Sequence, residues 1–558
     1  MHPVNTLYYG DNLEVLRKHI GDETVDLIYL DPPFNSNRDY NLLFKEQSGE
    51  PAQAQIKAFT DTWRWSERAF VEFCETSRLP RLVSLVQGFV ETLGRNDLTA
   101  YLVMMAPRLV ELHRVLKPTG SLYLHCDPTA SHYLKVMLDV IFGARNFRNE
   151  VVWKRTSAHS SAKRWGPVHD IILYYTKSEN YTWNPVYTEY ADAQVVDRFP
   201  YADERGRYGL RDLTGSGVRT GESGQEWRGI NPTTIGRHWA VPNRMVEAIA
   251  GKERAKQMSV QEKLDLLDAA GYIAWPKKGR MPKYKLYLAN TEGMVIQDVI
   301  SDIPPVPPTA RERLGYPTQK PLALLERIIQ ASSNEGEVVL DPFCGCGTAI
   351  VAAHKLNRRW IGIDITHLAI ALIKYRLSDM FDLKEGKDYQ VIGEPTTEAE
   401  ARALAQQDRD EFQKWAIGLV PRAFPYQQKK GADTGIDGML YFTDNPREHP
   451  KKVVIQVKSG RVGVKDIRDF RGVMEREKAV LGLFITLEPP TRDMAREAEQ
   501  AGFYTTPLGN IRLQRLQIRT IEDLLQGRGF DIPSAALLSG VQTAERVQPE
   551  SHQPELEM

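Results

Sequence analysis

Short apolar runs and amphipathic helical stretches alternate along the first third of the chain. Residues 25–30 are mostly apolar and end at an Asp-Pro-Pro turn, so they predict a buried strand with the turn at its carboxyl end. Residues 101–116 place apolar side chains near the helical period and predict a helix interrupted or kinked at Pro107. After an expected turn at 117–120, further buried strands are predicted at 121–125 and 171–176. This alternation favours an α/β sheet.

The pattern changes between about residues 178 and 300. Glycine, arginine, tryptophan and tyrosine are frequent there and the periodicity is poor, apart from one amphipathic helix expected near 260–270. The proline-rich stretch 303–308 fits neither a helix nor an inner strand, so it marks a boundary. Beyond it, α/β patterning resumes.

The resumed pattern predicts a βαβ unit. Pro321 suits the first position of a helix that runs to about residue 333. Strand 338–340, helix 349–356 and strand 360–364 follow, and then a long helix.

These shifts divide the chain into segments. We expect two halves of one α/β sheet at 1–180 and 311–391, separated by an insert at 181–310. Residues 392–410 are acidic and alanine-rich and are expected to form a linker that merges into a helix, ahead of a third domain at 411–530. Residues 541–558 have few large apolar side chains and are expected to be disordered.

Composition narrows the class of protein. A length of 558 residues suggests three or four domains. The formal net charge of +0 does not by itself favour a nucleic-acid partner, but residues 151–290 hold 22 Lys and Arg against 15 Asp and Glu. Four cysteines are no disulfide framework in so long a chain. No apolar run suits a membrane span and the N-terminus lacks a secretion pattern, so a cytoplasmic location without membrane association is expected.

The turn after the first predicted strand carries candidate chemistry. An amine attached to a nucleic-acid base is a poor nucleophile because its lone pair is delocalised into the ring. The carboxylate of Asp31 and the carbonyl of Pro32, aimed by the adjoining Pro33, suit accepting both N–H groups of such an amine. Phe34 offers a ring face for the base to stack on. A base held there must be flipped out of the duplex.

A glycine-rich loop lies about three hundred residues later, between predicted strand and helix. It reads Asp341-Pro-Phe-Cys-Gly-Cys-Gly-Thr348, and Gly345 and Gly347 would let the backbone pass close to a ligand. Asp364 ends the next predicted strand, where a carboxylate suits the hydroxyls of a ribose. The two cysteines of the loop are a poor zinc site because no second pair lies nearby.

With these motifs the chain resembles the β-class amino-DNA methyltransferases, in which the catalytic motif precedes the cofactor motif. Residues 9–11, 116–127 and 318–321 match further blocks of that family. The resemblance implies a circularly permuted, Rossmann-like sheet that uses S-adenosylmethionine, and a target-recognition insert that contacts double-stranded DNA. It assigns Asp31, Pro32, Pro33 and Phe34 to catalysis, and Asp11, Thr318, Lys320, Asp341, Phe343, Gly345, Gly347, Thr348 and Asp364 to the cofactor.

The resemblance leaves the target base open. Asp at the first position of Asp-Pro-Pro-Phe favours adenine N6 over cytosine N4, which stays the alternative. A C5-cytosine enzyme needs a Pro-Cys nucleophile, and none of the four cysteines follows a proline. The insert carries basic and aromatic residues suited to phosphates and bases, namely Arg219, Trp227, Arg228, Arg237, Trp239, Lys277, Lys278 and Arg280. Any one of them alone is more simply a solvated loop residue or, for tryptophan, a core residue.

The C-terminal region holds a second constellation. Asp437 precedes a predicted strand at 439–442, and Gln456 and Lys458 end the next strand at 453–458. On adjacent strands they would surround one Mg²⁺ and a phosphate. They resemble the Mrr-like branch of the PD-(D/E)xK nucleases, which implies a restriction-endonuclease-like α/β domain with the strand and helix near 480–501. Gln456 is a weaker ligand than the usual Glu and Glu411 is a candidate helix carboxylate, so a domain that only binds DNA stays the alternative.

The motifs together predict a site-specific DNA methyltransferase, acting in restriction-modification or defence, fused to a nuclease-like domain. A catalytically inactive DNA-binding protein is the contrasting hypothesis, and intact Asp31 and Phe34 disfavour it. The oligomeric state stays open, a homodimer included.

Overall fold

The computed structural model describes residues 5–33, 39–45, 51–60, 65–156, 165–276, 281–307, 310, 312, 319–426, 435–443, 450–507, 511–533 and 537–538. Phe34, Thr318, the three basic residues at 277–280 and the expected tail 541–558 lie outside these ranges.

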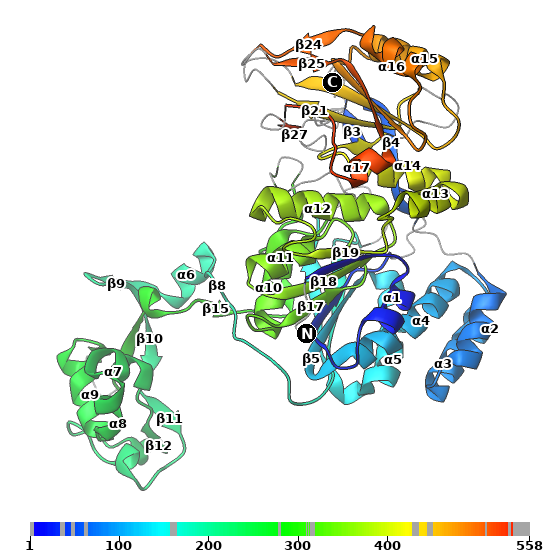
Figure 1. The fold of residues 1–558 in the computed structure, drawn as a ribbon. Helices are drawn as coiled ribbons and strands as arrows, with labels where there is room; N and C mark the ends of the chain where they lie inside the picture. The colour runs from blue at the N-terminus through cyan, green and yellow to red at the C-terminus, as the bar shows by residue number, and fades with distance from the viewer. Residues whose placement is uncertain are drawn as a thin grey trace, which may run out of the picture. The chain divides into compact units, whose positions relative to one another are not determined.

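A nine-stranded sheet combines strands from both ends of the methyltransferase-like region (Figure 1). Its order is β16 (Val299–Ile300), β6 (Phe147–Lys154), β7 (His169–Thr176), β5 (Leu116–Cys126), β2 (Val25–Leu30), β17 (Val338–Asp341), β18 (Arg359–Asp364), β1 (Thr6–Tyr9) and β19 (Gln390–Ile392). Neighbours are parallel except at β7, which is antiparallel to β5 and β6. The predicted buried strands are confirmed, as is the permuted α/β class.

Helices cover both faces of this sheet. Alternate side chains of a strand point to opposite faces, so in β2 Ile28 and Leu30 join one buried cluster whereas Leu27 and Tyr29 join the other. The first cluster is completed by α1 (Asn12–His19), α2 (Glu67–Thr76), α3 (Pro80–Leu93), α4 (Asp97–Val115) and α5 (Pro128–Leu138). The second is completed by α10 (Leu322–Ser332), α11 (Thr348–Lys355) and α12 (His367–Phe381).

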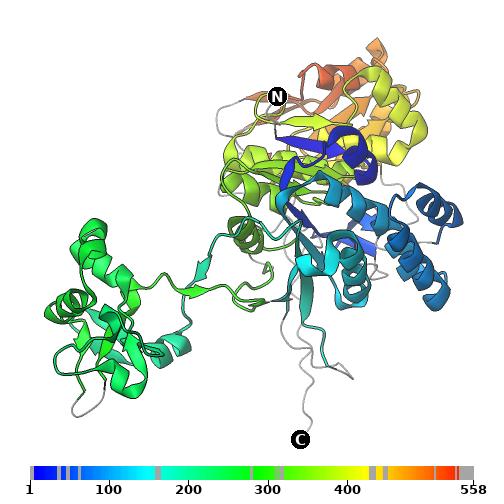
Figure 2. The same cartoon turned by 90° about the horizontal axis from the view of Figure 1, so that it is seen from below.

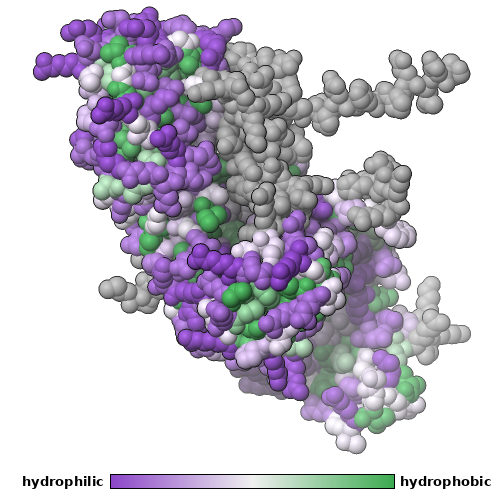
Figure 3. Space-filling model, turned by 90° about the vertical axis from the view of Figure 1, so that its right-hand side faces the viewer, coloured by the Kyte–Doolittle hydropathy of each residue, from purple (hydrophilic) through white to green (hydrophobic). Residues whose placement is uncertain are grey.

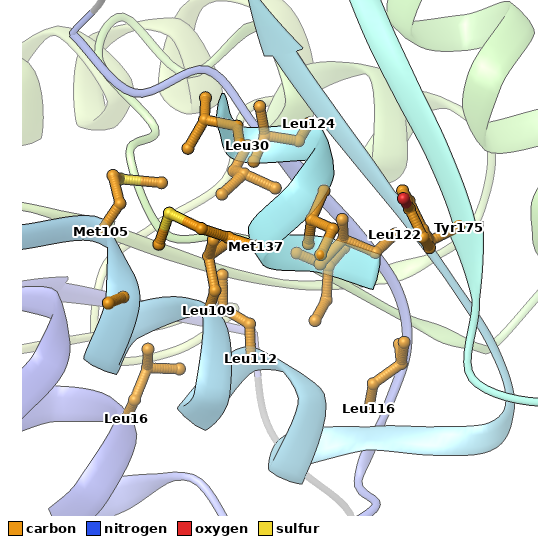
Figure 4. Close-up of a cluster of buried hydrophobic side chains, with 14 of the residues drawn as sticks. Leu16, Leu30, Met105, Leu109, Leu112, Leu116, Leu122, Leu124, Met137 and Tyr175 are labelled. Carbon is orange, nitrogen blue, oxygen red and sulfur yellow. The ribbon is translucent and has the colours of Figure 1, made fainter. Parts of the chain in front are cut away.

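Leucine packing dominates the first cluster (Figure 4). Leu109 and Leu112 of α4 lie with Leu122 and Leu124 of β5, and all four side chains are fully buried. Each such burial contributes about 1.5–3 kcal/mol relative to an exposed side chain. This core fixes β2 and β5 against α4, and thereby fixes the turns that leave the carboxyl ends of the two strands.

Residues 185–296 form a separate compact unit within the predicted insert. Its longest sheet joins β9 (Tyr201–Asp203), β10 (Gly206–Asp212), β13 (Ile273–Ala274) and β14 (Lys283–Tyr287), and a second pair joins β11 (Thr214–Ser216) and β12 (Arg237–Trp239). The unit also holds α6 (Asp192–Arg198), α7 (Asn243–Ala250), α8 (Lys252–Gln257) and α9 (Val260–Ala269), and the extended pair β8 (Tyr187–Thr188) and β15 (Met294–Val295) (Figure 2). The helix predicted near 260–270 is confirmed as α9.

The C-terminal domain is built on a second α/β sheet. Its strands are β20 (Phe424–Pro425), β21 (Gly438–Phe442), β22 (Lys451–Lys458), β23 (Leu481–Thr486) and β26 (Leu516–Thr520), with β27 (Leu537–Leu538) paired to β21. The helices are α13 (Glu398–Gln407), α14 (Arg409–Gly418), α15 (Val464–Arg476), α16 (Arg492–Glu499) and α17 (Ile521–Leu525). Ala401 and Ala405 of α13 are buried in the core of this domain, so much of the expected linker 392–410 is a packed helix.

Two further antiparallel pairs complete the described chain: β3 (Asp39–Lys45) with β4 (Pro51–Thr60), and β24 (Phe503–Thr505) with β25 (Arg512–Gln514). Hydrophilic side chains cover most of the described surface on the face shown in Figure 3. In the part of the chain that the structure describes, no helix is both long and apolar enough to cross a membrane.

Candidate active site

The two motifs that are far apart in sequence meet at the carboxyl ends of neighbouring strands. β2 and β17 are adjacent and parallel, with Leu27 opposite Val339 and Ile28 opposite Leu340. From β17 the chain continues to β18 on one side, whereas the next sheet neighbour of β2 is β5 on the other side. Such a reversal of strand order opens a crevice at the carboxyl edge of an α/β sheet. Asp31 and Asp341 both line the resulting cavity.

The catalytic turn contacts the segment that precedes α10. Asp31 Oδ2 lies 2.5 Å from Lys320 Nζ, and the two side chains are only 15% and 11% exposed. Pro32 is buried and Pro33 is half-buried, and both line the cavity beside Asp31. The structure therefore places Lys320, which the resemblance assigns to the cofactor, in direct contact with the carboxylate assigned to catalysis.

The glycine loop is held by its own backbone and by Asp364. Asp341 Oδ1 accepts from Phe343 N at 3.1 Å, and Gly345 N donates to Asp364 Oδ2 at 2.9 Å. Gly345 and Gly347 have φ values of 49° and 76°, in the left-handed region. At Gly347 a Cβ would lie 2.6 Å from Ile373 Cγ1 of α12. Glycine is therefore required at 347 by the backbone conformation and by helix packing, and not only by the approach of a ligand.

Two further aspartates line the same cavity, and both are already hydrogen-bonded. Asp364 Oδ1 accepts from the amide and the hydroxyl of Thr366, at 2.9 and 2.8 Å. Asp11 caps α1 by accepting from Leu13 N at 2.8 Å, and its Oδ2 accepts from Arg108 Nη2 at 2.6 Å. Each carboxylate is thus oriented by the protein itself, since neither can rotate without losing a bond.

Carboxylates outnumber cations around the cavity. Asp11, Asp31, Asp341 and Asp364 line it, and the cations among the lining residues are Arg108 and Lys320. Burial raises the pKa of Asp341 well above its ordinary value, and the neighbouring Asp31 and Asp364 raise it further. Burial also raises the pKa of Asp364. The crevice therefore favours a ligand that brings positive charge.

The structure adds lining residues that the sequence analysis did not single out: Asn12, Tyr29, Met104, Arg108, Leu325, Ile365 and Thr366. Arg108 Nε donates to Asn12 Oδ1 at 2.6 Å, and Asn12 Nδ2 donates to the carbonyl of Pro342 at 2.8 Å. Helix α4 thereby holds the start of α1 against the glycine loop. Tyr29 alone had a usable signal, because it lies two residues before Asp31 in a buried strand.

The cysteines of the glycine loop do not form a metal site among the described residues. Cys344 and Cys346 are buried, and burial raises the pKa of both thiols. Within the described ranges no group of three or more His, Cys, Asp or Glu could hold a metal ion. This agrees with the prediction that the two cysteines are small residues in a tight loop.

The C-terminal constellation is brought together by strand pairing. Gly438 pairs with Ile455, so Asp437 lies opposite Gln456 at the edge of β21 and β22. Asp437 Oδ2 accepts from Val457 N at 2.7 Å, and Gln456 Nε2 donates to the carbonyl of Gly435 at 3.0 Å. Gln456 and Lys458 are two residues apart on one strand and point to the same side.

Glu411, the other candidate of that domain, lies on α14. Its Oε1 accepts from Lys414 Nζ at 2.8 Å. It lies close enough to Tyr9, at the end of β1, to raise the pKa of that phenol together with burial.

The aromatic residues predicted for DNA contact divide into core and surface. Trp227 and Trp239 are 3% and 2% exposed and belong to the core of the 185–296 unit. Arg219 is exposed. Arg228 pairs with Asp268 and Asp265, and Arg237 Nη2 lies 3.7 Å from Asp212 Oδ2. The two tryptophans are therefore core residues, as the simpler interpretation of a single tryptophan has it.

Two family profiles match the chain. The profile described as DNA methylase matches residues 25–374, and the profile described as restriction endonuclease matches residues 404–513. The first range contains Asp31, Asp341 and Asp364, and the second contains the residues at the edge of β21 and β22.

Individual proteins are similar over parts of the chain. The type II methyltransferase M.EcaI of Enterobacter cloacae is 33% identical over 280 residues, covering 50% of this chain and 58% of the relative. The DNA adenine methyltransferase YhdJ of Escherichia coli (strain K12) is 24% identical over 362 residues, covering 64% and 78%. The chain spans between 50% and 59% of the length of M.EcaI and two other curated relatives. The crystal structure of a DNA modification methylase from Thermus thermophilus with S-adenosyl-L-methionine is 16% identical, with a TM-score of 0.31, covering 70% of this chain and 100% of that one.

Proposed function

Because the chain belongs to the DNA methylase family whose profile covers residues 25–374, we propose that it methylates the exocyclic amine of a base flipped out of double-stranded DNA. The observation that carries the proposal is the meeting of Asp31 and the glycine loop at one crevice, on adjacent strands β2 and β17. Acceptors for an amine and a cradle for a cofactor therefore share one cavity.

Asp31 and Pro32 supply the catalytic acceptors. In the base, the amine lone pair is delocalised, and two acceptors on its N–H groups favour a tetrahedral nitrogen with a localised lone pair. The Asp31 carboxylate and the Pro32 carbonyl are the acceptors, and the two consecutive prolines restrict the backbone that presents them. Lys320, 2.5 Å from Asp31 Oδ2, balances the negative charge of that carboxylate and must yield one of its lone pairs to the amine.

The crevice fits S-adenosylmethionine, which when bound supplies a methyl group on a positively charged sulfur. Four carboxylates line the cavity, and the lining cations Arg108 and Lys320 are each paired with one of them. A ligand carrying a sulfonium and an ammonium group matches that charge. Asp364 would hold the ribose, the loop from Asp341 to Thr348, with Phe343 in it, would hold the remainder, and Asp11 would face the adenine.

Adenine N6 is the proposed target, with cytosine N4 as the alternative. The acidic residue at the head of the Asp-Pro-Pro turn supports adenine. The 185–296 unit is proposed to contact the DNA around the flipped base, where its exposed Arg219 would meet phosphates or base edges. A role in restriction-modification is supported by the two profiles on one chain.

Label transfer from S-adenosylmethionine to DNA tests the methylation proposal. Asp31→Ala removes one of two acceptors and should lower the rate by at least about a hundredfold, with folding and cofactor affinity retained. Asp302→Asn alters an aspartate that pairs with Arg327 outside the cavity lining, so it should keep the wild-type rate. Digestion of the labelled DNA to nucleosides then distinguishes N6-methyladenine from N4-methylcytosine. Transfer that survives Asp31→Ala would sink the catalytic assignment.

We also infer a Mg²⁺-dependent nuclease activity in the C-terminal domain. The observation that favours it is the pairing of Asp437 with Gln456 at a strand edge, inside the range of the restriction endonuclease profile. Gln456 donates its Nε2 to Gly435, which leaves Oε1 as its acceptor end, so a carboxylate and an amide oxygen offer the ligands that Mg²⁺ prefers. Lys458 would stabilise charge on the phosphodiester. The alternative is a domain that binds DNA without cutting it.

Cleavage of unmodified plasmid DNA with and without Mg²⁺ tests this second activity. Lys458→Ala should abolish Mg²⁺-dependent cutting while leaving methyl transfer intact, because Lys458 lies outside the methyltransferase crevice. Lys465→Ala, at an exposed position of α15, should cut like wild type. If wild-type protein cuts no unmodified substrate in Mg²⁺, the binding-only alternative stands.

A further inference from the structure

A chain of buried polar side chains crosses three adjacent strands beside the catalytic turn. Tyr29 of β2 shares a hydrogen bond with His125 Nδ1 of β5 at 2.9 Å between the oxygen and nitrogen. The other ring nitrogen, His125 Nε2, lies 3.3 Å from Asp170 Oδ2 of β7. Tyr29, His125 and Asp170 are 2%, 0% and 2% exposed. Three polar groups so deeply buried are retained at a cost unless their hydrogen bonds serve a purpose.

The chain lies at the edge of the sheet that carries the crevice. β2 and β5 are parallel and end there, and β7 is antiparallel to β5, so Asp170 at its start lies at the same edge. Tyr29 lines the cavity and lies two residues before Asp31. At the far end of the chain, Arg155 Nε lies 3.2 Å from Asp170 Oδ1. The order is thus Arg155, Asp170, His125 and Tyr29, running toward the catalytic turn.

The order of the groups fixes the direction of the protons. Asp170 beside Arg155 is a carboxylate and accepts, so His125 carries its proton on Nε2 and presents Nδ1 as an acceptor. Burial and the nearby Lys320 lower the pKa of His125, which keeps the ring neutral. Tyr29 must then donate its hydroxyl proton to His125. Its pKa is raised by burial and by Asp31 and Asp341, so the phenol stays protonated.

We propose that Tyr29, His125 and Asp170 are positioning residues for methyl transfer: by taking the Tyr29 proton, His125 keeps that hydroxyl from donating to Asp31 and fixes the end of β2 under the catalytic turn. Asp31 and Asp341 are the carboxylates of the crevice that lie near Tyr29. A tyrosine released from His125 would compete with the target amine for the Asp31 carboxylate. The inference rests on the proposed methyl transfer and names residues outside the matched motifs that support it.

The structure offers a matched control for Tyr29 on the neighbouring strand. Tyr123 of β5 is the register partner of Tyr29, belongs to the same buried cluster, and its hydroxyl lies 2.7 Å from Ser332 Oγ. Tyr123→Phe therefore removes a buried tyrosine hydrogen bond from the same face of the sheet without touching the crevice. Loss of stability alone affects both variants alike.

Single-turnover methyl transfer, with S-adenosylmethionine and DNA bound beforehand, separates positioning from folding. Tyr29→Phe and Asp170→Asn should each slow transfer by roughly tenfold to a hundredfold, the range expected for a misplaced catalytic group, while the dissociation constant of S-adenosylmethionine changes less than about threefold. Tyr123→Phe should transfer at a rate close to wild type. Equal rates for Tyr29→Phe and Tyr123→Phe, or a loss in Tyr29→Phe confined to cofactor affinity, would overturn the inference.

The same assay distinguishes failure of this inference from failure of the proposed function. If wild-type protein transfers methyl groups and Asp31→Ala does not, but Tyr29→Phe behaves as wild type, only the positioning role is wrong. If wild-type protein transfers no label to DNA, the proposed function itself fails and the positioning role falls with it.

Discussion

At the scale of single residues, Asp364 carries two structural duties before any ligand arrives. One oxygen accepts from Gly345 N, and the other accepts from the amide and hydroxyl of Thr366. The carboxylate therefore connects the glycine loop to the turn before α12. It can hold a cofactor ribose only through its remaining lone pairs, so its orientation is set in advance.

Replacing that carboxylate tests whether loop and cofactor share it. In Asp364→Asn the amide NH₂ cannot accept from either Gly345 or Thr366, so one side of the connection is lost. Hydrogen bonds to charged groups contribute about 1.5–3 kcal/mol, so we expect the affinity for S-adenosylmethionine to fall by roughly tenfold or more. Isothermal titration calorimetry measures it.

A helix cap elsewhere in the chain is the control for that variant. Asp408 also accepts from two backbone N–H groups, those of Asp410 and Glu411, and does not line the crevice. Asp408→Asn should therefore lower stability without a change in cofactor affinity. An unchanged affinity in Asp364→Asn would show that Asp364 is not a cofactor ligand.

Site residues differ in how far the sequence predicts them. Asp31, Asp341 and Asp364 each come at or after the end of an apolar run, and that pattern alone places them at one sheet edge. The contact of Lys320 with Asp31 joins residues 289 positions apart, so it depends on tertiary packing that no local pattern encodes. Arg108 is a similar case, because its helix was predictable but its contact with Asp11 was not.

At the scale of elements, α4 shows why a local rule yields to packing. Pro107 predicts an interruption or kink, yet the helix runs from Asp97 to Val115 with the proline inside it. Met105, Leu109 and Leu112 are fully buried around that position, and their burial outweighs the roughly 3 kcal/mol that a proline costs in a helix. Nearby, Arg108 Nη1 donates to the carbonyl of Met104 at 2.8 Å and so adds a side-chain bond to this part of the helix.

The predicted turn at 117–120 and the observed strand β5 are reconciled by a register shift. Val25 pairs with Leu116 and Leu27 pairs with Ser121, so the residues between Leu116 and Ser121 bulge from the ladder. Lys117 Nζ lies 2.7 Å from Asp26 Oδ1 and fastens the bulge to β2. Strands of the 185–296 unit were not predicted because most are two to three residues long, and a period cannot be recognised over so few positions.

At the scale of the molecule, one buried cluster joins the methyltransferase region to the C-terminal domain. It contains Cys346 of the glycine loop and Leu372 of α12, together with Ile436 and Met439 beside the nuclease-like edge. Arg376 of α12, 3% exposed, donates to the carbonyl of Cys346 at 2.7 Å. These regions belong to one compact unit, whereas residues 185–296 have a hydrophobic core of their own.

Calorimetric unfolding should therefore show two transitions, a large one for the joined regions and a small one for residues 185–296. S-adenosylmethionine at a hundred times its dissociation constant should stabilise the large transition by about 2.7 kcal/mol, the C-terminal domain included. Leu372→Ala removes a side chain that is 7% exposed and should destabilise the whole large transition by about 2–5 kcal/mol. Leu267→Ala, in the core of the 185–296 unit, should shift only the small transition, because Leu267 packs within that unit. A C-terminal domain that melts separately, with a midpoint unmoved by the cofactor or by Leu372→Ala, would show that the shared cluster does not couple the two regions.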